Sequence, residues 1–370
     1  MYIPIMKNRD EELRVSAVCA DFFSESMIPM YEIIQDKFLD RFEVDEDTGE
    51  FKYELKVGKT GKSRRSKVKL STREEDIITL KDINERINGK KAFIDFFRFF
   101  ENEYGSRNFK NIETSFRLSR DFDYYKKRLL QLASFENFIP TISIKKGLEI
   151  SFYDLSILIK ELRLDNVSIA LRITADCLDT YSQFIEENIF DKDYVMLDIR
   201  ENSIYSKELE IEEFTDLNSQ GKKILLNSPR KKDTANKDFE NLKFTNKIDN
   251  IVSQYYLDIN LDGFGDFGGL KDDLPTYGGG GRGAALALLY FSTENKFYSV
   301  VNKDTSLGVG GYAYVKQEII KRRHQIDPDD TCLGMKKIDT LKNGTYASWN
   351  NVNLTRYIQS QAKNQSLIHI

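Results

Sequence analysis

Histidine, cysteine and tryptophan are scarce in this sequence of 370 residues, which contains two histidines, three cysteines and one tryptophan. With only His324 and His369 available, a Ser-His-Asp triad, a Cys-His pair or a histidine-rich metal site is not expected. Cys19, Cys177 and Cys332 lie far apart and form no CxxC pair, which argues against zinc sites and a disulfide framework. A reducing cytoplasm is therefore the expected setting.

The sequence also lacks a long apolar run and a strong net charge. No segment approaches the roughly 18 apolar residues of a membrane span. The apolar run Tyr2–Met6 is too short for the core of a signal peptide, so we expect a cytoplasmic protein without membrane contact. The 55 Lys and Arg residues against 59 Asp and Glu give a formal net charge of -4. Nucleic-acid binding would therefore need a local basic patch.

Eight short apolar runs, separated by helical segments, dominate the chain. The runs are 2–6, 27–34, 92–97, 138–144, 168–173, 194–199, 224–227 and 261–267. Parallel strands that are buried on both faces have such continuous apolar runs. Pro4, Pro29 and Pro140 fall near the start of three runs, where a strand tolerates proline. The repeated order predicts an α/β protein with a (β/α)8 TIM-barrel-like fold; an open doubly wound sheet is the alternative, because a count of strands does not show closure.

Two additions to this frame are expected. Residues 43–70 read as a basic β-hairpin around the sequence GKTGK, with charged and apolar residues alternating. Its candidate binding residues are Lys59, Lys62, Arg64, Arg65 and Lys67. A second hairpin, Gly283–Val301, precedes helices near 311–323 and 352–362. We expect residues 1–310 to form a single barrel-like domain and residues 311–370 to pack on it as a helical extension that caps its open end.

The carboxyl ends of barrel strands meet at one mouth, where the active sites of such barrels lie. The polar residues expected there are Lys7, Glu32, Asp95, Lys145, Arg172, Asp198, Arg200, Asn227, and Asp262 or Asp266. Candidates for catalysis are the acids Glu32, Asp198, Asp262 and Asp266, with Arg172 and Arg200 as an anion clamp. Such a set suits a phosphoester or glycosidic substrate, or a divalent cation with oxygen ligands. The alternative is a ring of satisfied ion pairs without chemistry.

The segment 261–282, LDGFGDFGGLKDDLPTYGGGGR, combines several acids with a run of glycines. Glycine lets backbone N–H groups approach a ligand closely, although tight turns explain the same composition. The candidate binding residues here are Gly278, Gly279, Gly280, Gly281 and Arg282. In chain order the segment is the eighth strand and the loop after it. We therefore expect Asp266 to face Glu32 across the closure of the barrel.

The opening MYIPIMKNRDEELRV and the later MIPMYEI resemble the start of the Beta protein family and of related bacterial proteins found among phage-defence genes. The matching residues are Tyr2, Pro4, Lys7, Glu12, Leu13, Pro29 and Glu32. Gly263–Phe267, and Gly278–Gly281 followed by Ala284–Tyr290, look similar to the related proteins. The resemblance implies a barrel-like component of a bacterial or prophage anti-phage defence system. Its partner would be a protein from the same locus, with an immunity, antitoxin-like or sensor role for this chain.

Three hypotheses about function follow from the sequence. The first is the defence component, which binds a partner protein or a phage component. The second is a metal-assisted hydrolase with the carboxylates at the barrel mouth. The third is a nucleic-acid-binding module that uses the basic hairpin, for which binding should weaken steeply with added salt.

Overall fold

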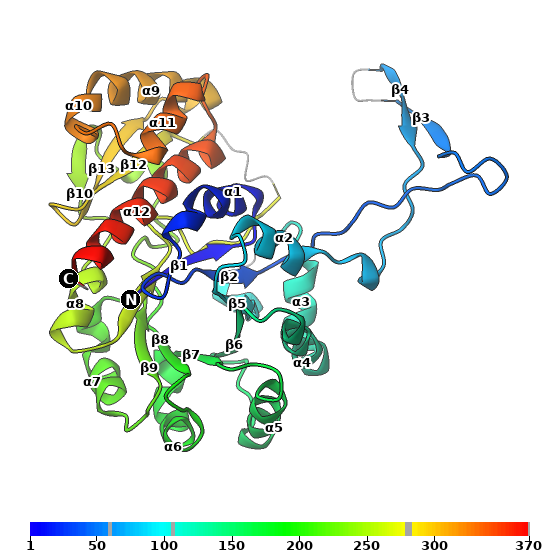
Figure 1. The fold of residues 1–370 in the computed structure, drawn as a ribbon. Coiled ribbons are helices and arrows are strands. Elements are labelled where there is room, and N and C mark those ends of the chain that lie inside the picture. The colour runs from blue at the N-terminus through cyan, green and yellow to red at the C-terminus, as the bar shows by residue number, and fades with distance from the viewer. Residues whose placement is uncertain (58–60, 105–107, 278–282, 369–370) are drawn as a thin grey trace.

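The computed structural model describes residues 1–57, 61–104, 108–277 and 283–368. Eight parallel strands close into a barrel in the order β1-β11-β9-β8-β7-β6-β5-β2 (Figure 1). Their bounds are β1 Tyr2–Lys7, β2 Met30–Ile33, β5 Ala92–Phe96, β6 Phe138–Ile144, β7 Ala170–Thr174, β8 Tyr194–Asp198, β9 Lys222–Leu226 and β11 Gly263–Asp266. Each of the eight predicted apolar runs overlaps one of these barrel strands.

Strand β1 closes the barrel because it pairs with β2 on one side and with β11 on the other. Ile5 lies opposite Met30, and Tyr2 lies opposite Phe264. The TIM-barrel-like prediction is therefore confirmed, and the open-sheet alternative is wrong. Every residue of β1 is buried, as expected for a strand with the barrel interior on one face and helices on the other.

Helices alternate with the barrel strands and surround them. They are α1 Asp10–Cys19, α2 Thr79–Arg86, α3 Glu113–Arg120, α4 Phe122–Leu130, α5 Phe152–Leu162, α6 Leu178–Asn188, α7 Glu208–Asp216 and α8 Val252–Asp258. The long C-terminal helix α12 (Tyr346–Ile368) packs against α1 and β1 along the outer wall (Figure 1). We expected the C-terminal residues to cap the open end of the barrel, whereas α12 joins the ring of helices around it.

A small antiparallel sheet precedes α12. Its order is β10-β13-β12, with β10 at Lys243–Thr245, β12 at Ala285–Phe291 and β13 at Lys296–Asn302. The pairing of β12 with β13 confirms the predicted second hairpin. The short helices after it are α9 Tyr312–Lys321, α10 Arg323–Ile326 and α11 Leu333–Thr340. They share a separate apolar core with the sheet, in which Leu289, Val315 and Trp349 are buried.

The predicted basic hairpin is also present. Strands β3 (Tyr53–Val57) and β4 (Ser63–Lys67) pair antiparallel, within an arm (residues 43–70) that projects away from the barrel (Figure 1). Every residue of β3 is exposed. The arm therefore adds a surface to the molecule without adding to its core.

Candidate functional site at the barrel mouth and on the arm

Arg172, on β7, forms the centre of a buried charge network inside the barrel mouth. Its Nη1 lies 2.8 Å from Glu32 Oε1 and 2.9 Å from Asp95 Oδ2, and its Nη2 lies 2.7 Å from Asp198 Oδ2. Glu32, Asp95 and Asp198 lie at the last or next-to-last position of their strands. Arg172 is the middle residue of β7, and its long side chain reaches the same place. All four are at least 96% buried, so the ion pairs are shielded from water.

Asp272 extends this network from the loop after β11. Lys7 Nζ lies 2.7 Å from Asp272 Oδ1 and 2.6 Å from Glu32 Oε2. Arg200 Nη2 lies 3.0 Å from Asp272 Oδ2, and Arg200 Nη1 lies 3.5 Å from Asp198. We define the buried charge network as Lys7, Glu32, Asp95, Arg172, Asp198, Arg200 and Asp272.

Three cations and four carboxylates alternate in this network, and each carboxylate lies next to at least one cation. Burial alone would raise the pKa of the Asp198 and Asp272 carboxyls, but the adjacent arginines and Lys7 lower the pKa of both groups. Both acids are therefore ionised at neutral pH, and cationic side chains occupy the oxygen atoms that a metal ion would need. Within the described ranges, no group of three His, Cys, Asp or Glu side chains is placed to hold a metal ion. The geometry is closer to a ring of buried ion pairs than to a metal-binding acid cluster, although Asp95 Oδ1 has no hydrogen-bond partner among the described residues.

Two of the predicted mouth acids lie elsewhere. Asp262 precedes β11, so it lies at the opposite end of the barrel, where its carboxylate accepts a hydrogen bond from the Lys223 N–H at 2.8 Å. Asp266 ends β11, but its side chain points outward to Tyr2 and Tyr357 rather than toward Glu32. Successive strand residues point to opposite faces, so a place at the strand end does not fix which face a side chain occupies. The expected Glu32–Asp266 pairing is therefore wrong.

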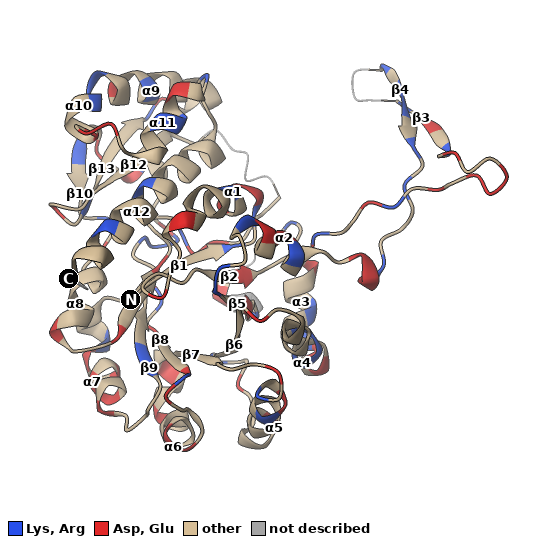
Figure 2. Ribbon diagram, in the orientation of Figure 1, with Lys and Arg blue, Asp and Glu red and all other residues tan. Residues whose placement is uncertain are grey.

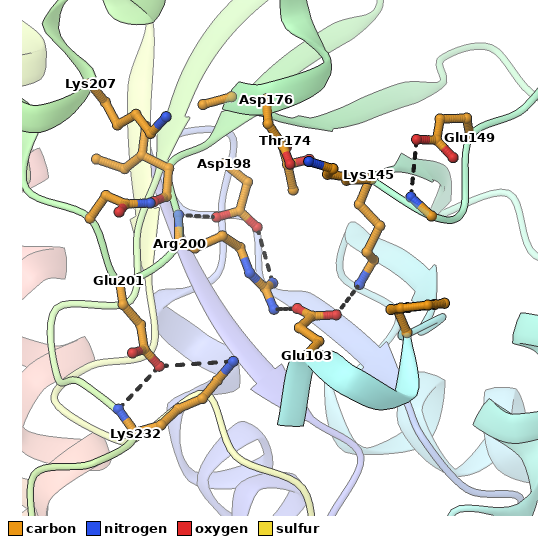
Figure 3. A pocket seen from close by; sticks show the side chains of 16 residues that line it. Glu103, Lys145, Glu149, Thr174, Asp176, Asp198, Arg200, Glu201, Lys207 and Lys232 are labelled. Atoms are coloured by element: carbon orange, nitrogen blue, oxygen red, sulfur yellow. Dashed lines mark hydrogen bonds and ion pairs between the residues drawn. The ribbon is translucent and has the colours of Figure 1, made fainter. Parts of the chain in front are cut away.

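A pocket of about 890 Å³ opens beside the network, between the ends of β6, β7 and β8. Figure 3 shows its charged lining, in which Lys145 points toward Glu103. Among the residues that line this mouth pocket are Phe100, Glu103, Lys145, Asp198, Arg200 and Lys232. Asp198 and Arg200 also belong to the charge network, so the pocket shares one wall with it.

Glu103 is a residue of the pocket that sequence reasoning missed. It lies on a short 3-10 turn, Glu101–Tyr104, after β5, and its carboxylate forms an ion pair with Arg200. The next residue, Tyr104, donates a hydrogen bond to Asp272 at 3.3 Å. Nothing in the local sequence ENEYGSR marks this turn as part of the mouth, since its position depends on where the loop after β5 folds back.

The candidate binding residues on the arm lie on two faces of the hairpin. The register places Leu55 opposite Arg65 and Tyr53 opposite Lys67, while Lys56 lies opposite Arg64. Side chains at paired positions share a face, so Arg65 and Lys67 share the face of the apolar residues and Arg64 has the other. The Arg65 guanidinium lies 4.0 Å from the centre of the Tyr53 ring.

Not every predicted binding residue can be placed. Lys62 directly precedes β4, within the described part of the arm. Lys59 lies outside the described residues, and so do Gly278, Gly279, Gly280, Gly281 and Arg282. For these positions the sequence-based expectation stays a prediction.

Comparison with known proteins gives no family for the chain. No protein-family model matches it, and a search of curated proteins finds no significant match. The resemblance to the Beta protein family therefore stays a prediction beyond the barrel-like fold. Over the described ranges, no helix is long and apolar enough to cross a membrane.

Proposed function

We propose that this chain is a binding protein whose arm docks a second protein. The observation that carries the proposal is the exposure of Leu55 and Val57, which are 75% and 70% accessible on one face of the hairpin. An isolated two-stranded hairpin is marginally stable in water. Burial of each side chain by a partner would contribute about 1.5–3 kcal/mol.

The charges around these apolar side chains define the chemistry of the partner. Residues 53–67 contain six Lys or Arg residues and one Glu. Figure 2 shows this basic colouring on β4 and an acidic loop next to β3. Arg65 and Lys67 lie on the same face as Leu55, so the matching surface would have an apolar centre and an acidic rim. Charges at the rim of an interface steer association and select the partner.

This proposal agrees with the expected role in anti-phage defence, in which the chain acts as an immunity, antitoxin-like or sensor partner of another protein. It requires no catalysis by this chain. The metal-assisted hydrolase is supported less, because the carboxylates Glu32 and Asp198 already bind Arg172. A defence assay on Asp198→Ala separates the two, since the hydrolase hypothesis predicts complete loss of protection with the fold preserved.

Nucleic acid is the second candidate occupant of the arm, favoured by the six basic residues between 53 and 67. A nucleic acid and a protein would bind the hairpin through different properties of its surface. A polyanion binds through the total positive charge and loses affinity steeply with salt. A protein with an apolar centre requires one face, so residues on the opposite face should matter less.

Arg64 and Arg65 form a matched pair for the test, since they are adjacent and exposed but lie on opposite faces. Arg65→Glu and Arg64→Glu change the charge of the arm equally. Protection against phage, measured as efficiency of plating in the natural host, should fall at least tenfold for Arg65→Glu and less than threefold for Arg64→Glu. Equal losses for both variants would contradict the docking of one face.

A photo-crosslinking amino acid at position 55 identifies the occupant directly. The matched control is position 164, because Leu164 is 82% exposed but lies just after α5 on the barrel. We expect a protease-sensitive adduct of defined mass from position 55, absent from position 164 and abolished by Arg65→Glu. A nuclease-sensitive adduct with steep salt dependence would favour nucleic acid instead, and identical adducts from both positions would refute a docking role for the arm.

A further inference from the structure

Lys145 is a buried cation for which the described part of the chain provides no hydrogen-bond acceptor. The residue is 8% exposed, and its Nζ lies 3.9 Å from the nearest carboxylate, Glu103 Oε2. That distance is too long for a hydrogen bond. Among the described residues, no acceptor lies within hydrogen-bonding distance of this ammonium group, which lies 4.4 Å from the centre of the Phe97 ring. An ammonium group has three donors, and Lys145 lines an open pocket, where an entering anion would accept hydrogen bonds from them.

Lys232 lines the same pocket, and its ammonium group also lies beyond hydrogen-bonding distance of the nearest carboxylate. Its Nζ lies 3.9 Å from Glu201 Oε1 and 4.1 Å from the centre of the Tyr104 ring. Two of the acids that line the pocket have closer partners: Asp198 binds Arg172, and Glu201 accepts the Lys232 N–H at 3.1 Å. Asp176, which also lines the pocket, is exposed to water. On the wall formed by Glu103, Lys145 and Lys232, the groups left to bind a ligand are therefore the two ammonium groups.

Glu103 occupies the space between the cations. Its carboxylate forms an ion pair with Arg200 and lies next to Lys145, as the close-up of the pocket shows (Figure 3). It comes from a short turn rather than from a barrel strand. An external carboxylate or phosphate that entered the pocket would meet the same positive charges.

We infer that the mouth pocket binds a small molecule with a carboxylate or phosphate monoester group, which Lys145 and Lys232 hold by charge-assisted hydrogen bonds. An apolar part of the ligand would lie against Phe100, which lines the pocket and is exposed. The site is independent of the arm, so it adds a ligand to the proposed binding protein. Burial lowers the pKa of Lys145 to about 8, an effect that a bound anion would reverse.

Calorimetric titration with phenyl phosphate and with phenylacetate tests the inference, with benzyl alcohol as the uncharged analogue. We expect saturable binding of at least one anion and none of the alcohol. Lys145→Met should weaken that binding at least tenfold, and Glu103→Gln should tighten it because an internal competitor loses its charge. The matched control is Lys81→Met, which removes an exposed charge on α2. Binding of phenyl phosphate alone assigns a phosphate monoester, and binding of phenylacetate alone assigns a carboxylate.

A second measurement uses the unaltered protein, so it does not depend on how the Lys145 variant folds. Acetic anhydride acetylates lysines, and peptide mass spectrometry measures the rate at each position. A saturating anion should slow acetylation of Lys145 at least fivefold and leave that of Lys81 unchanged. Absence of saturable binding up to 10 mM anion, or equal binding by Lys145→Met, or unchanged acetylation of Lys145, would overturn the inference.

Discussion

The outward-facing carboxyl of Asp266 makes the stability of the fold depend on pH. Its hydrogen-bond donors are the hydroxyls of Tyr357 at 2.7 Å and Tyr2 at 3.1 Å and the Gly268 N–H at 2.8 Å, all of them uncharged. Burial raises the pKa of Asp266 from 3.8 to about 6, although these hydrogen bonds lower it in part. The folded protein therefore holds this proton more tightly than the unfolded chain. The stabilisation is fully present below pH 3.8 and is lost as the pH rises through 6.

Replacement of Asp266 by asparagine should remove this dependence. The Asn Oδ1 keeps the hydrogen bonds from Tyr2 and Gly268. The Asn amide can donate to the Tyr357 hydroxyl, which is then free to donate its own hydrogen to Asn250 Oδ1, 3.0 Å away. A difference of about 2 pKa units corresponds to about 3 kcal/mol, so Asp266→Asn should be more stable than the original protein by about 3 kcal/mol at pH 8 and by about 1.6 kcal/mol at pH 5.

Urea unfolding of both proteins between pH 5 and pH 8 measures this effect. The gap in the free energy of unfolding should widen by about 1.4 kcal/mol over that range. Tyr357→Phe is the companion variant, since it removes one donor to the carboxylate and should raise the pKa of Asp266 further. Carbon-13 NMR of the Asp266 carboxyl follows that pKa directly. Parallel pH profiles for Asp266→Asn and the original protein would refute the reasoning.

Two further predictions concern the barrel itself. Arg172→Met should lower the free energy of unfolding by about 3–5 kcal/mol, because it leaves three buried carboxylates without their common cation. Urea unfolding measures the loss, with Arg14→Met as the control because Arg14 is exposed. A similar loss in the two variants would contradict the prediction. Gly265→Ala should cost about 1–3 kcal/mol, because the new Cβ would lie 2.6 Å from Leu226 Cδ2 and 2.8 Å from a backbone oxygen. Gly283→Ala is its thermal-unfolding control, since no atom lies within 4 Å of that Cβ. Equal melting temperatures for the two variants would disprove the close packing at β11.

The sequence was sufficient to predict most of the barrel frame. Buried parallel strands need apolar residues on both faces, so runs such as 138–144 and 194–199 mark them without any tertiary information. The arm was predictable for a different reason, since alternating residues around GKTGK are a local signal of a hairpin. Both signals depend on the conformation of a few consecutive residues.

Only the tertiary structure showed which side chains make up the buried charge network at the barrel mouth. Strand-end position correctly placed Glu32, Arg172 and Asp198 together, but it could not show that Asp266 faces the helix α12. Which face of the barrel the Asp266 side chain occupies depends on the pairing register of β11 with β1, and that register is set by residues far apart in the sequence. Glu103 and Asp272 arrive from loops whose paths follow from packing over the mouth.

The closure of the barrel likewise depended partly on the local sequence and partly on the tertiary structure. The sequence indicated eight strands separated by helical segments, because hydrophobic periodicity and helix caps depend on neighbouring residues. Whether β1 would meet β11 depended on contacts between residues more than 250 positions apart, and so did the outward path of α12. The local sequence determined the helices and strands of this protein, whereas their packing decided which charged side chains became buried partners and which lysines line the mouth pocket.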